Sequence, residues 1–185
     1  MTEHSFSKKD AQSKKASSEQ TTPLALRLWT DAISPQGYFD PRYTCDFDNS
    51  SPELRWDHAP PETQSFALLC EDLDTGPPTF VHWIVTHIPE GIHHLPAGIP
   101  PQEALPNGIR QGLNSYGRLG YAGPCPPQGS RAHQYRFRLF ALSEHLPHLS
   151  RITRDTLLEL ISPICLTQAE LEGRYQRALP HRAAS

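Results

Sequence analysis

The stretch G-Y-A-G-P-C-P-P-Q-G-S-R-A-H-Q-Y-R-F-R-L-F-A-L, residues 120–142, decides the fold of this chain. From His133 onward apolar and polar residues alternate, and His133 and Tyr135 share one face with the apolar residues that follow them. A period of two is typical of a β-strand with one buried face, so we expect the other face, which carries arginines, to be solvated. The first half predicts a loop in which glycines permit tight bends and prolines stiffen the backbone.

Outside this stretch the sequence predicts more strands and few helices. The chain contains 19 prolines, which favour short strands joined by shaped loops. Runs rich in apolar, β-branched and aromatic residues predict strands at 24–29, 66–70 and 81–88. Leucines at helical spacing predict a helix over 153–161, and a capping-box pattern of Thr167 with Glu170 predicts a second helix from Thr167. We therefore expect a mainly β fold, a β-sandwich with two short helices near the C-terminal end.

The composition limits the classes of protein to which this chain could belong. The chain has 185 residues and a formal net charge of −3, which suits one domain and argues against a general nucleic-acid binder. All of its lysines lie in residues 1–22, where almost nothing is apolar. We expect a disordered tail at 1–22, a single domain at 23–180 and a short tail at 181–185. No apolar run is long enough to span a bilayer, and the N-terminus lacks the apolar core of a secretory signal, so we expect a cytoplasmic protein.

The cysteines give no local motif. They lie far apart in the sequence and form no C-x-x-C pair, which argues against a zinc or redox site built from neighbouring residues. In a cytoplasmic protein such thiols are expected to stay reduced. The four residues are Cys45, Cys70, Cys125 and Cys165.

A predicted buried strand is followed by a cluster of carboxylates and then by a histidine. This segment, residues 70–83, reads C-E-D-L-D-T-G-P-P-T-F-V-H-W. A metal site, an acid–base pair, an anion pocket and an ordinary loop would all fit this pattern. Asp72 and Asp74 point the same way in extended backbone and could ligate a metal with His82. The sequence shows no complete ligand set, so neither a metal nor another cofactor is expected. Alternatively, a buried His82 could simply have Asp72 or a backbone carbonyl as its hydrogen-bond partner and serve no function.

His82 has potential partners in the second motif. If His82 and His133 lie on neighbouring strands, their imidazoles converge with the Tyr135 phenol and the Asp72 carboxylate. The carboxylate would raise the pKa of a nearby imidazole and keep it cationic, and these donors suit an oxyanion. The same groups could serve as a general base, with Cys125 as a nucleophile. The chain has no nucleophile-elbow, papain-like or Walker motif.

The chain resembles the phosphatidylethanolamine-binding protein family, in particular its bacterial Raf-kinase-inhibitor-like branch. The family's D-P-D-x-P loop before an H-W or H-F strand reads E-D-L-D-T-G-P-P-T-F-V-H-W here. The family's G-x-x-G-P-x-P-P-x-G-x-x-H-x-Y stretch begins here at Gly120. Shorter matches are S-P-E-L-R-W at 51–56 and A-E-L-E-G-R-Y at 169–175, and together the resemblance covers residues 24–178.

The resemblance implies a β-sandwich of antiparallel Greek-key strands with a small anion-binding pocket near one edge. It implies ligands such as phosphate or a phosphoethanolamine-like headgroup and, in some members, inhibition or scaffolding of a kinase or protease. No common catalytic activity accompanies the fold. The implied pocket residues are Asp72, His82, His133 and Tyr135, with Gly123, Pro124, Cys125 and Pro126 as one wall and Asp74 at the rim.

The sequence departs from the family pattern in two places, and Glu71 adds a charge beside the pocket. Leu73 stands where the family has the proline of D-P-D, and Gly76-Pro77 stands where a single proline is usual. Glu71 adds a charge that would oppose an anion if it faced the pocket. We expect Glu71 to turn to solvent or to pair with an arginine such as Arg118.

Three functions fit this sequence. The leading hypothesis is a non-enzymatic protein that binds a small anion or a phosphorylated headgroup. The second is an interaction protein that buries the pocket rim against a partner such as a kinase or protease. The third is an enzyme that uses a pocket histidine as acid or base. The sequence leaves the oligomeric state open and is compatible with a homodimer.

Overall fold

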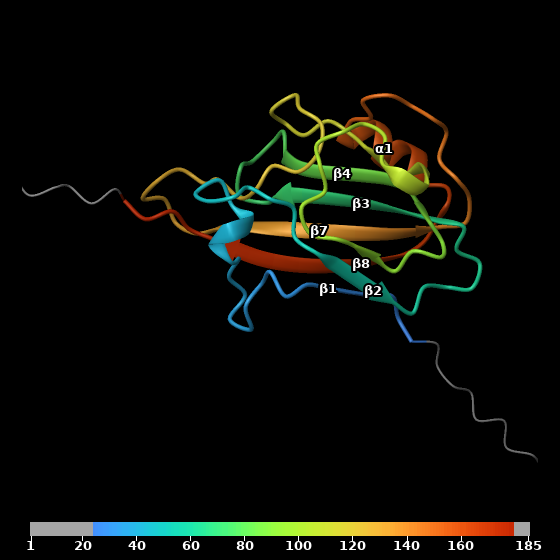
Figure 1. Ribbon diagram of the computed structural model, residues 1–185, viewed down its shortest axis with the longest axis horizontal. Coiled ribbons are helices and arrows are strands. Elements are labelled where there is room, and N and C mark those ends of the chain that lie inside the picture. The colour runs from blue at the N-terminus through green and yellow to red at the C-terminus, as the bar shows by residue number, and fades with distance from the viewer. Residues whose placement is uncertain (1–23, 180–185) are drawn as a thin grey trace, which may run out of the picture.

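The computed structural model describes residues 24–179, so the tails expected at 1–22 and 181–185 lie outside the described residues. Two antiparallel sheets pack against each other, and a helix covers the far side of the larger sheet (Figure 1). The smaller sheet has the order β1 (Arg27–Trp29), β2 (Leu54–Asp57), β5 (His94–Leu95). The larger sheet has the order β6 (Arg110–Gln111), β4 (Phe80–Pro89), β3 (Ser65–Asp72), β7 (His133–Leu142), β8 (Cys165–Tyr175).

The helical elements are few. The α-helix α1 spans Arg154–Ile161, and two short 3₁₀ turns, η1 and η2, span Pro41–Tyr43 and Pro106–Gly108. The mainly β sandwich predicted from the sequence is therefore confirmed. Within residues 24–179, no helix is both long enough and apolar enough to cross a membrane.

Strand β3 lies at the centre of the core because every one of its residues is buried. Phe66 and Leu68 point into the cluster shared with the smaller sheet, whereas Ala67 and Leu69 point into the cluster beneath α1. A strand covered on both faces needs a continuous apolar run, which is what its sequence supplies. Each buried side chain of this size stabilises the fold by roughly 1.5–3 kcal/mol.

Most of the expected elements are confirmed. The strand at 133–142 matches β7, and the strands at 66–70 and 81–88 lie within β3 and β4. The helix expected over 153–161 begins one residue later as α1, and only residues 27–29 of the segment 24–29 form a strand.

The second expected helix is wrong. Cys165–Tyr175 forms the strand β8, which pairs antiparallel with β7 along its whole length. The capping-box pattern is a local signal, whereas the edge of β7 presents N–H and C=O groups that need partners. Ala169, Gly173 and Tyr175 alternate with exposed residues and face the core, and this period of two fits that edge. A side chain at Gly173 would collide with the ring of Phe39.

The expectation that all four cysteines are reduced is also wrong. Cys45 and Cys125 form a disulfide, with their Cα atoms 5.4 Å apart, although 80 residues separate them in the sequence. The loop after η1 lies against the loop before β7, because the Cys45 N–H donates to the Pro124 carbonyl at 3.2 Å. Cys70 and Cys165 remain free thiols.

The arginine face of β7 is only partly solvated. Arg138 has a side chain that is 14% exposed and donates to Glu71 at 2.7 Å. Glu71 is itself 1% exposed and accepts a second hydrogen bond at 2.6 Å from Arg154 at the start of α1. The prediction that Glu71 pairs with an arginine is confirmed, but Arg118 is not the partner.

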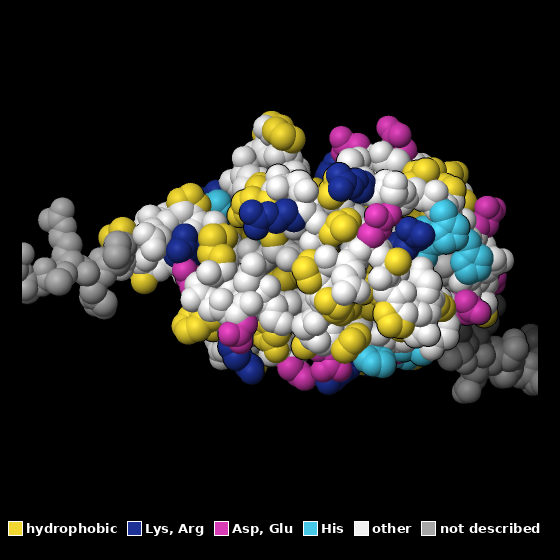
Figure 2. Space-filling model, turned by 45° about the horizontal axis from the view of Figure 1, so that its top comes forward, with side chains coloured by type: hydrophobic (Ala, Val, Ile, Leu, Met, Phe, Trp, Pro, Cys, Tyr) yellow, Lys and Arg dark blue, Asp and Glu magenta, His cyan; other side chains and the backbone are white. Residues whose placement is uncertain are grey.

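Charges of both signs are interspersed on the surface shown in Figure 2, which agrees with the small net charge of the chain. Histidines are part of this surface as well. His93, which directly precedes β5, and His94, the first residue of β5, are both exposed.

Candidate functional site

Three neighbouring strands assemble the candidate site. β3 lies between β4 and β7, and its last residue, Asp72, is opposite Phe80 on one side and Tyr135 on the other. His82 follows Phe80 by two residues and His133 precedes Tyr135 by two residues. Residues opposite each other, and residues two apart on one strand, share a face of the sheet. The four polar side chains, Asp72, His82, His133 and Tyr135, form what we call the His–Tyr cluster.

Asp72 holds His133 rather than His82. Its Oδ2 accepts a hydrogen bond from Nδ1 of His133 at 2.8 Å, and its Oδ1 accepts one from the backbone N–H of Asp74 at 2.8 Å. A carboxylate only accepts, so Nδ1 of His133 carries the proton. The Nε2 atom of His133 is then the nitrogen that remains for a ligand.

His82 is buried and neutral. Its Nδ1 donates to the carbonyl oxygen of Ala122 at 2.6 Å. Burial lowers the pKa of His82, and the smaller effects of the Ala122 carbonyl and of Asp72 oppose this only in part. At neutral pH its Nε2 is therefore an acceptor. The imidazole that pairs with the Asp72 carboxylate is that of His133, whereas His82 has a backbone carbonyl as partner, which was among the alternatives.

Tyr135 is fully buried, and its ring packs edge-on against His82 with 5.1 Å between centroids. Its hydroxyl lies close to the Asp72 carboxylate and to the Cys125 backbone, but it makes no hydrogen bond of good geometry to them or to any other described residue. Burial raises the pKa of Tyr135, and the Asp72 carboxylate raises it further, against a weaker opposing effect of the Cys125 backbone. The phenol therefore stays protonated and can donate a hydrogen bond.

The backbone from Gly123 to Pro126 is positioned as a wall of the cluster by the loop after η1. The N–H of Gly123 donates to Oδ1 of Asn49 at 2.7 Å, and a Cβ at Gly123 would collide with the Tyr43 carbonyl. Prolines have no N–H, so Cys125 carries the one N–H of this wall with no partner among the described residues.

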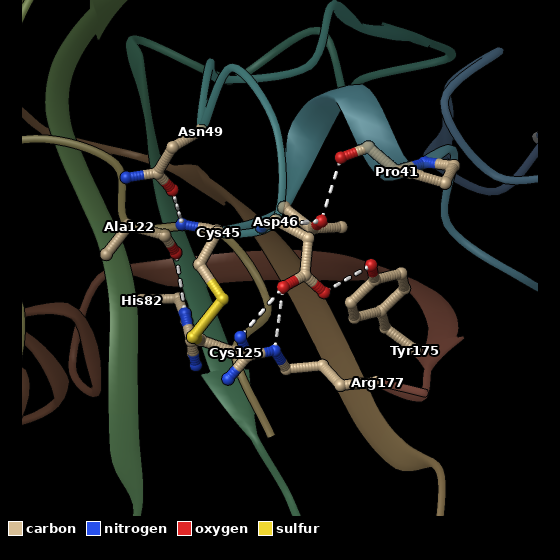
Figure 3. Close-up of a disulfide and its surroundings, with 11 residues drawn as sticks. Pro41, Cys45, Asp46, Asn49, His82, Ala122, Cys125, Tyr175 and Arg177 are labelled. Carbon is tan, nitrogen blue, oxygen red and sulfur yellow. Dashed lines mark hydrogen bonds and ion pairs between the residues drawn. A yellow bond between two sulfur atoms is a disulfide. The ribbon is translucent and has the colours of Figure 1, made fainter. Parts of the chain in front are cut away.

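The disulfide lies beside the cluster. Figure 3 shows it with the ring of His82 on one side and the ion pair of Arg177 with Asp46 on the other. Because Cys125 is bonded to Cys45, it has no thiolate, and the nucleophile considered from the sequence is absent.

The rim is formed by the turn after β3. Asp74 accepts from the backbone N–H of Gln134 at 2.7 Å and pairs with the exposed Arg131. The N–H of Leu73 donates to the Gln134 carbonyl at 2.8 Å, a bond that a proline at this position could not make. The leucine that departs from the family pattern thus extends the pairing of β3 with β7.

The cluster is nearly closed. Asp72 and His82 are 3% and 2% exposed, and the side chain of His133, 13% exposed, provides the opening. A groove of about 950 Å³ adjoins the wall at Gly123 and Cys125, but no side chain of the cluster lines it. Within residues 24–179, no set of three or more His, Cys, Asp or Glu residues is arranged to hold a metal ion.

Sequence reasoning missed several residues that position the cluster. Ala122 orients His82 through its carbonyl, and Asn49 holds the wall from 74 residues away. Neither residue type signals such a role. Phe80, whose ring lies 4.9 Å from that of His82, could have been found from the sequence, because it lies two residues from His82 on the same strand.

Comparisons with known proteins agree with this fold. The family model described as "Phosphatidylethanolamine-binding protein" matches residues 29–176. A UPF0098 protein of Methanothermobacter thermautotrophicus is 40% identical over 152 residues, which cover 82% of this chain and 99% of that protein. The crystal structure of Escherichia coli YbcL, described as a new member of the mammalian PEBP family, superposes with a TM-score of 0.76 at 27% identity and covers 83% of this chain and 99% of that one. The structure of the Chlamydia trachomatis homologue CT736 gives 0.74 at 31% identity, covering 83% and 98%.

Proposed function

Because the chain belongs to the phosphatidylethanolamine-binding protein family, we propose that it is a non-enzymatic protein that binds a small phosphorylated or otherwise anionic ligand in the His–Tyr cluster. The ligand class is a phosphate group, either free or as a headgroup resembling phosphoethanolamine. Tyr135, His82, His133 and the Cys125 N–H would contact it, and Asp72 would orient His133.

The unpartnered hydroxyl of Tyr135 carries the proposal. A buried O–H without an acceptor is rare in folded proteins and destabilises them by about 1–3 kcal/mol. This hydroxyl faces the cluster in which Asp72 and His133 are already paired. An anion oxygen between Tyr135 and the neighbouring donors would complete the missing hydrogen bond.

The protonation of His82 specifies the form of the ligand. Its Nε2 accepts at neutral pH, because Nδ1 donates to Ala122 and burial lowers the pKa. A monoanionic phosphate has a P–OH (one in a phosphomonoester, two in inorganic phosphate) that can donate to Nε2 while its unprotonated oxygens accept from Tyr135 and from the Cys125 N–H. A phosphomonoester is monoanionic below a pH of about 6, so binding is expected to be tighter at mildly acid pH.

The experiment is calorimetry with inorganic phosphate and with phosphoethanolamine at pH 6 and pH 8. We expect saturable binding that is stronger at pH 6, and an increase in melting temperature with ligand concentration. His133→Gln should weaken binding at least about tenfold, since a hydrogen bond to a charged group contributes about 1.5–3 kcal/mol. His93→Gln, at an exposed histidine, is the matched control. No binding at millimolar ligand, or equal affinity in His133→Gln, would contradict the proposal.

The Cys45–Cys125 disulfide argues against thiol catalysis and against a reducing compartment. The cluster has no activated nucleophile, since Cys125 is in the disulfide. No contact within residues 24–179 favours a kinase or protease as partner, so we propose ligand binding alone. Disulfides persist in oxidising compartments, which is at odds with the cytoplasmic location expected from the N-terminal sequence.

A further inference from the structure

The groove beside the wall at Gly123 and Cys125 has side chains that are not part of the His–Tyr cluster. Its volume of about 950 Å³ is within the range of small-molecule sites, about 300–1,000 Å³. Apolar side chains such as Ile99, Leu113 and Leu119 line part of it, and Tyr116, which is 55% exposed, adds an aromatic ring. It could therefore hold an organic molecule much larger than phosphate.

Two arginines of this groove, Arg118 and Arg151, differ from the other arginines of the described chain. Their guanidinium groups make no ion pair, hydrogen bond or stacking contact within residues 24–179. Every other arginine of these residues pairs with a carboxylate, except Arg174, which lies over the ring of Tyr38 and donates to a backbone carbonyl. The paired arginines are Arg27, Arg42, Arg55, Arg110, Arg131, Arg136, Arg138, Arg154 and Arg177.

The backbone brings these two arginines together. Leu113 pairs with Leu119 on one side, and its N–H donates to the carbonyl of Ile152 at 3.1 Å on the other. Arg118 and Arg151 directly precede these two neighbours of Leu113. Leu113 therefore lies between the segment that carries Arg118 and the segment that carries Arg151, and both arginines line the same groove. Their side chains are long and flexible enough for both guanidinium groups to approach one anion there.

The segment that carries Arg118 is held in place before any ligand arrives. The side chain of Asn114, 6% exposed, accepts hydrogen bonds from the N–H groups of Tyr116 and Arg118 at 3.0 and 3.2 Å and donates to the Gly120 carbonyl at 3.0 Å. Arg151 has a left-handed backbone, with φ 53°, a conformation that costs a non-glycine residue free energy. The adjoining Ile152 is buried and fixes the position of that strained residue.

We propose that Arg118 and Arg151 form a second anion site, which binds a soluble organic phosphate or carboxylate through both guanidinium groups and packs its apolar body in the groove. Arginine suits such oxyanions because its planar group donates two parallel hydrogen bonds. The groove has one lining carboxylate, Asp48, so the arginines give it a net positive charge. This site does not depend on the His–Tyr cluster and persists if the cluster binds nothing.

The test uses 1-naphthyl phosphate, which has both an apolar body and an oxyanion, with the full chain in calorimetry. The variants are the double substitution Arg118→Gln with Arg151→Gln, and His133→Gln to weaken binding at the cluster. Arg174→Gln is the matched control, because Arg174 also lacks a carboxylate partner but does not line the groove. Inorganic phosphate and 1-naphthol serve as the anion without the body and the body without the anion.

We expect His133→Gln to retain one saturable site for 1-naphthyl phosphate that weakens as salt is added. Adding the double substitution to His133→Gln should weaken that site roughly a hundredfold, about tenfold for each lost charge-assisted interaction. Naphthol and phosphate should each bind more weakly than the combined probe. In amide-detected NMR, the signals of Gly117 and Asn114 should shift with the probe in His133→Gln.

Three results would overturn the proposal. The first is equal affinity with and without Arg118 and Arg151. The second is an equal loss in Arg174→Gln, which would show a general effect of net charge. The third is the disappearance of all probe binding in His133→Gln, which would assign the probe to the cluster. Because Arg118 and Arg151 are exposed, the variants should fold, and an unchanged melting temperature verifies this.

Discussion

Replacing Tyr135 with phenylalanine should make the protein more stable and a weaker anion binder. The substitution removes one oxygen atom and keeps the ring that packs against His82 and Phe39. The oxygen removed is buried and has no partner among the described residues. Stability and binding should therefore change in opposite directions at this position.

The magnitude follows from the cost of a buried unpaired hydroxyl. Relieving that cost should raise the free energy of unfolding by about 1–3 kcal/mol. For a chain of this length, about 2–4 °C of melting temperature corresponds to each kcal/mol, so an increase of roughly 2–12 °C is expected without ligand. Loss of a hydrogen bond to a charged ligand should weaken phosphate binding by about 1.5–3 kcal/mol, roughly tenfold or more.

The assay is thermal and urea denaturation with and without phosphate, combined with calorimetry. Tyr121→Phe is the matched control, because the Tyr121 hydroxyl donates to the Tyr43 carbonyl at 2.8 Å. That control should lose about 0.5–1.5 kcal/mol of stability and bind phosphate as the parent does.

A Tyr135→Phe protein that is less stable than the parent without ligand would refute the reasoning. It would mean that the hydroxyl has an acceptor, for example the nearby Asp72 carboxylate. A variant that is more stable but binds phosphate normally would leave the stability argument intact and remove Tyr135 from the proposed site.

Further predictions concern pH, the disulfide and the buried carboxylate. Burial lowers the pKa of His82 and His87 below the ordinary 6.5, so the unfolded chain binds more protons in acid. The stability that these two neutral histidines contribute is fully present above pH 6.5 and is lost as the pH falls through their folded-state pKa values. A melting temperature that increases as the pH is lowered from 7 to 5 would contradict this. Reduction of Cys45–Cys125, which spans 80 residues, should cost about 4.5 kcal/mol in the chain-entropy model, measured by melting with and without a phosphine reductant; an unchanged transition would mean that the bond does not form. Glu71→Gln leaves two arginines without their carboxylate and should cost about 3 kcal/mol in urea denaturation, and a loss below 1 kcal/mol would show that the pair contributes little.

The sequence by itself determined the features that depend on local periodicity and residue type. The alternation after His133, the apolar run at 66–70 and the segment 81–88 each predicted a strand in the correct place. The same local patterns, read as motifs, led to the family and to the side chains that the structure brings together around Asp72.

Only the tertiary structure decided how these pieces are partnered. Pairing with the open edge of β7 turned a capping-box sequence into the strand β8. The disulfide joins residues 80 apart, and no spacing rule connects them. Asp72 could have held either histidine, and the ladder of β3 with β7 assigns it to His133. The charge of His82 depends on desolvation by surrounding strands and loops, which a sequence does not specify because burial is a property of the packed molecule.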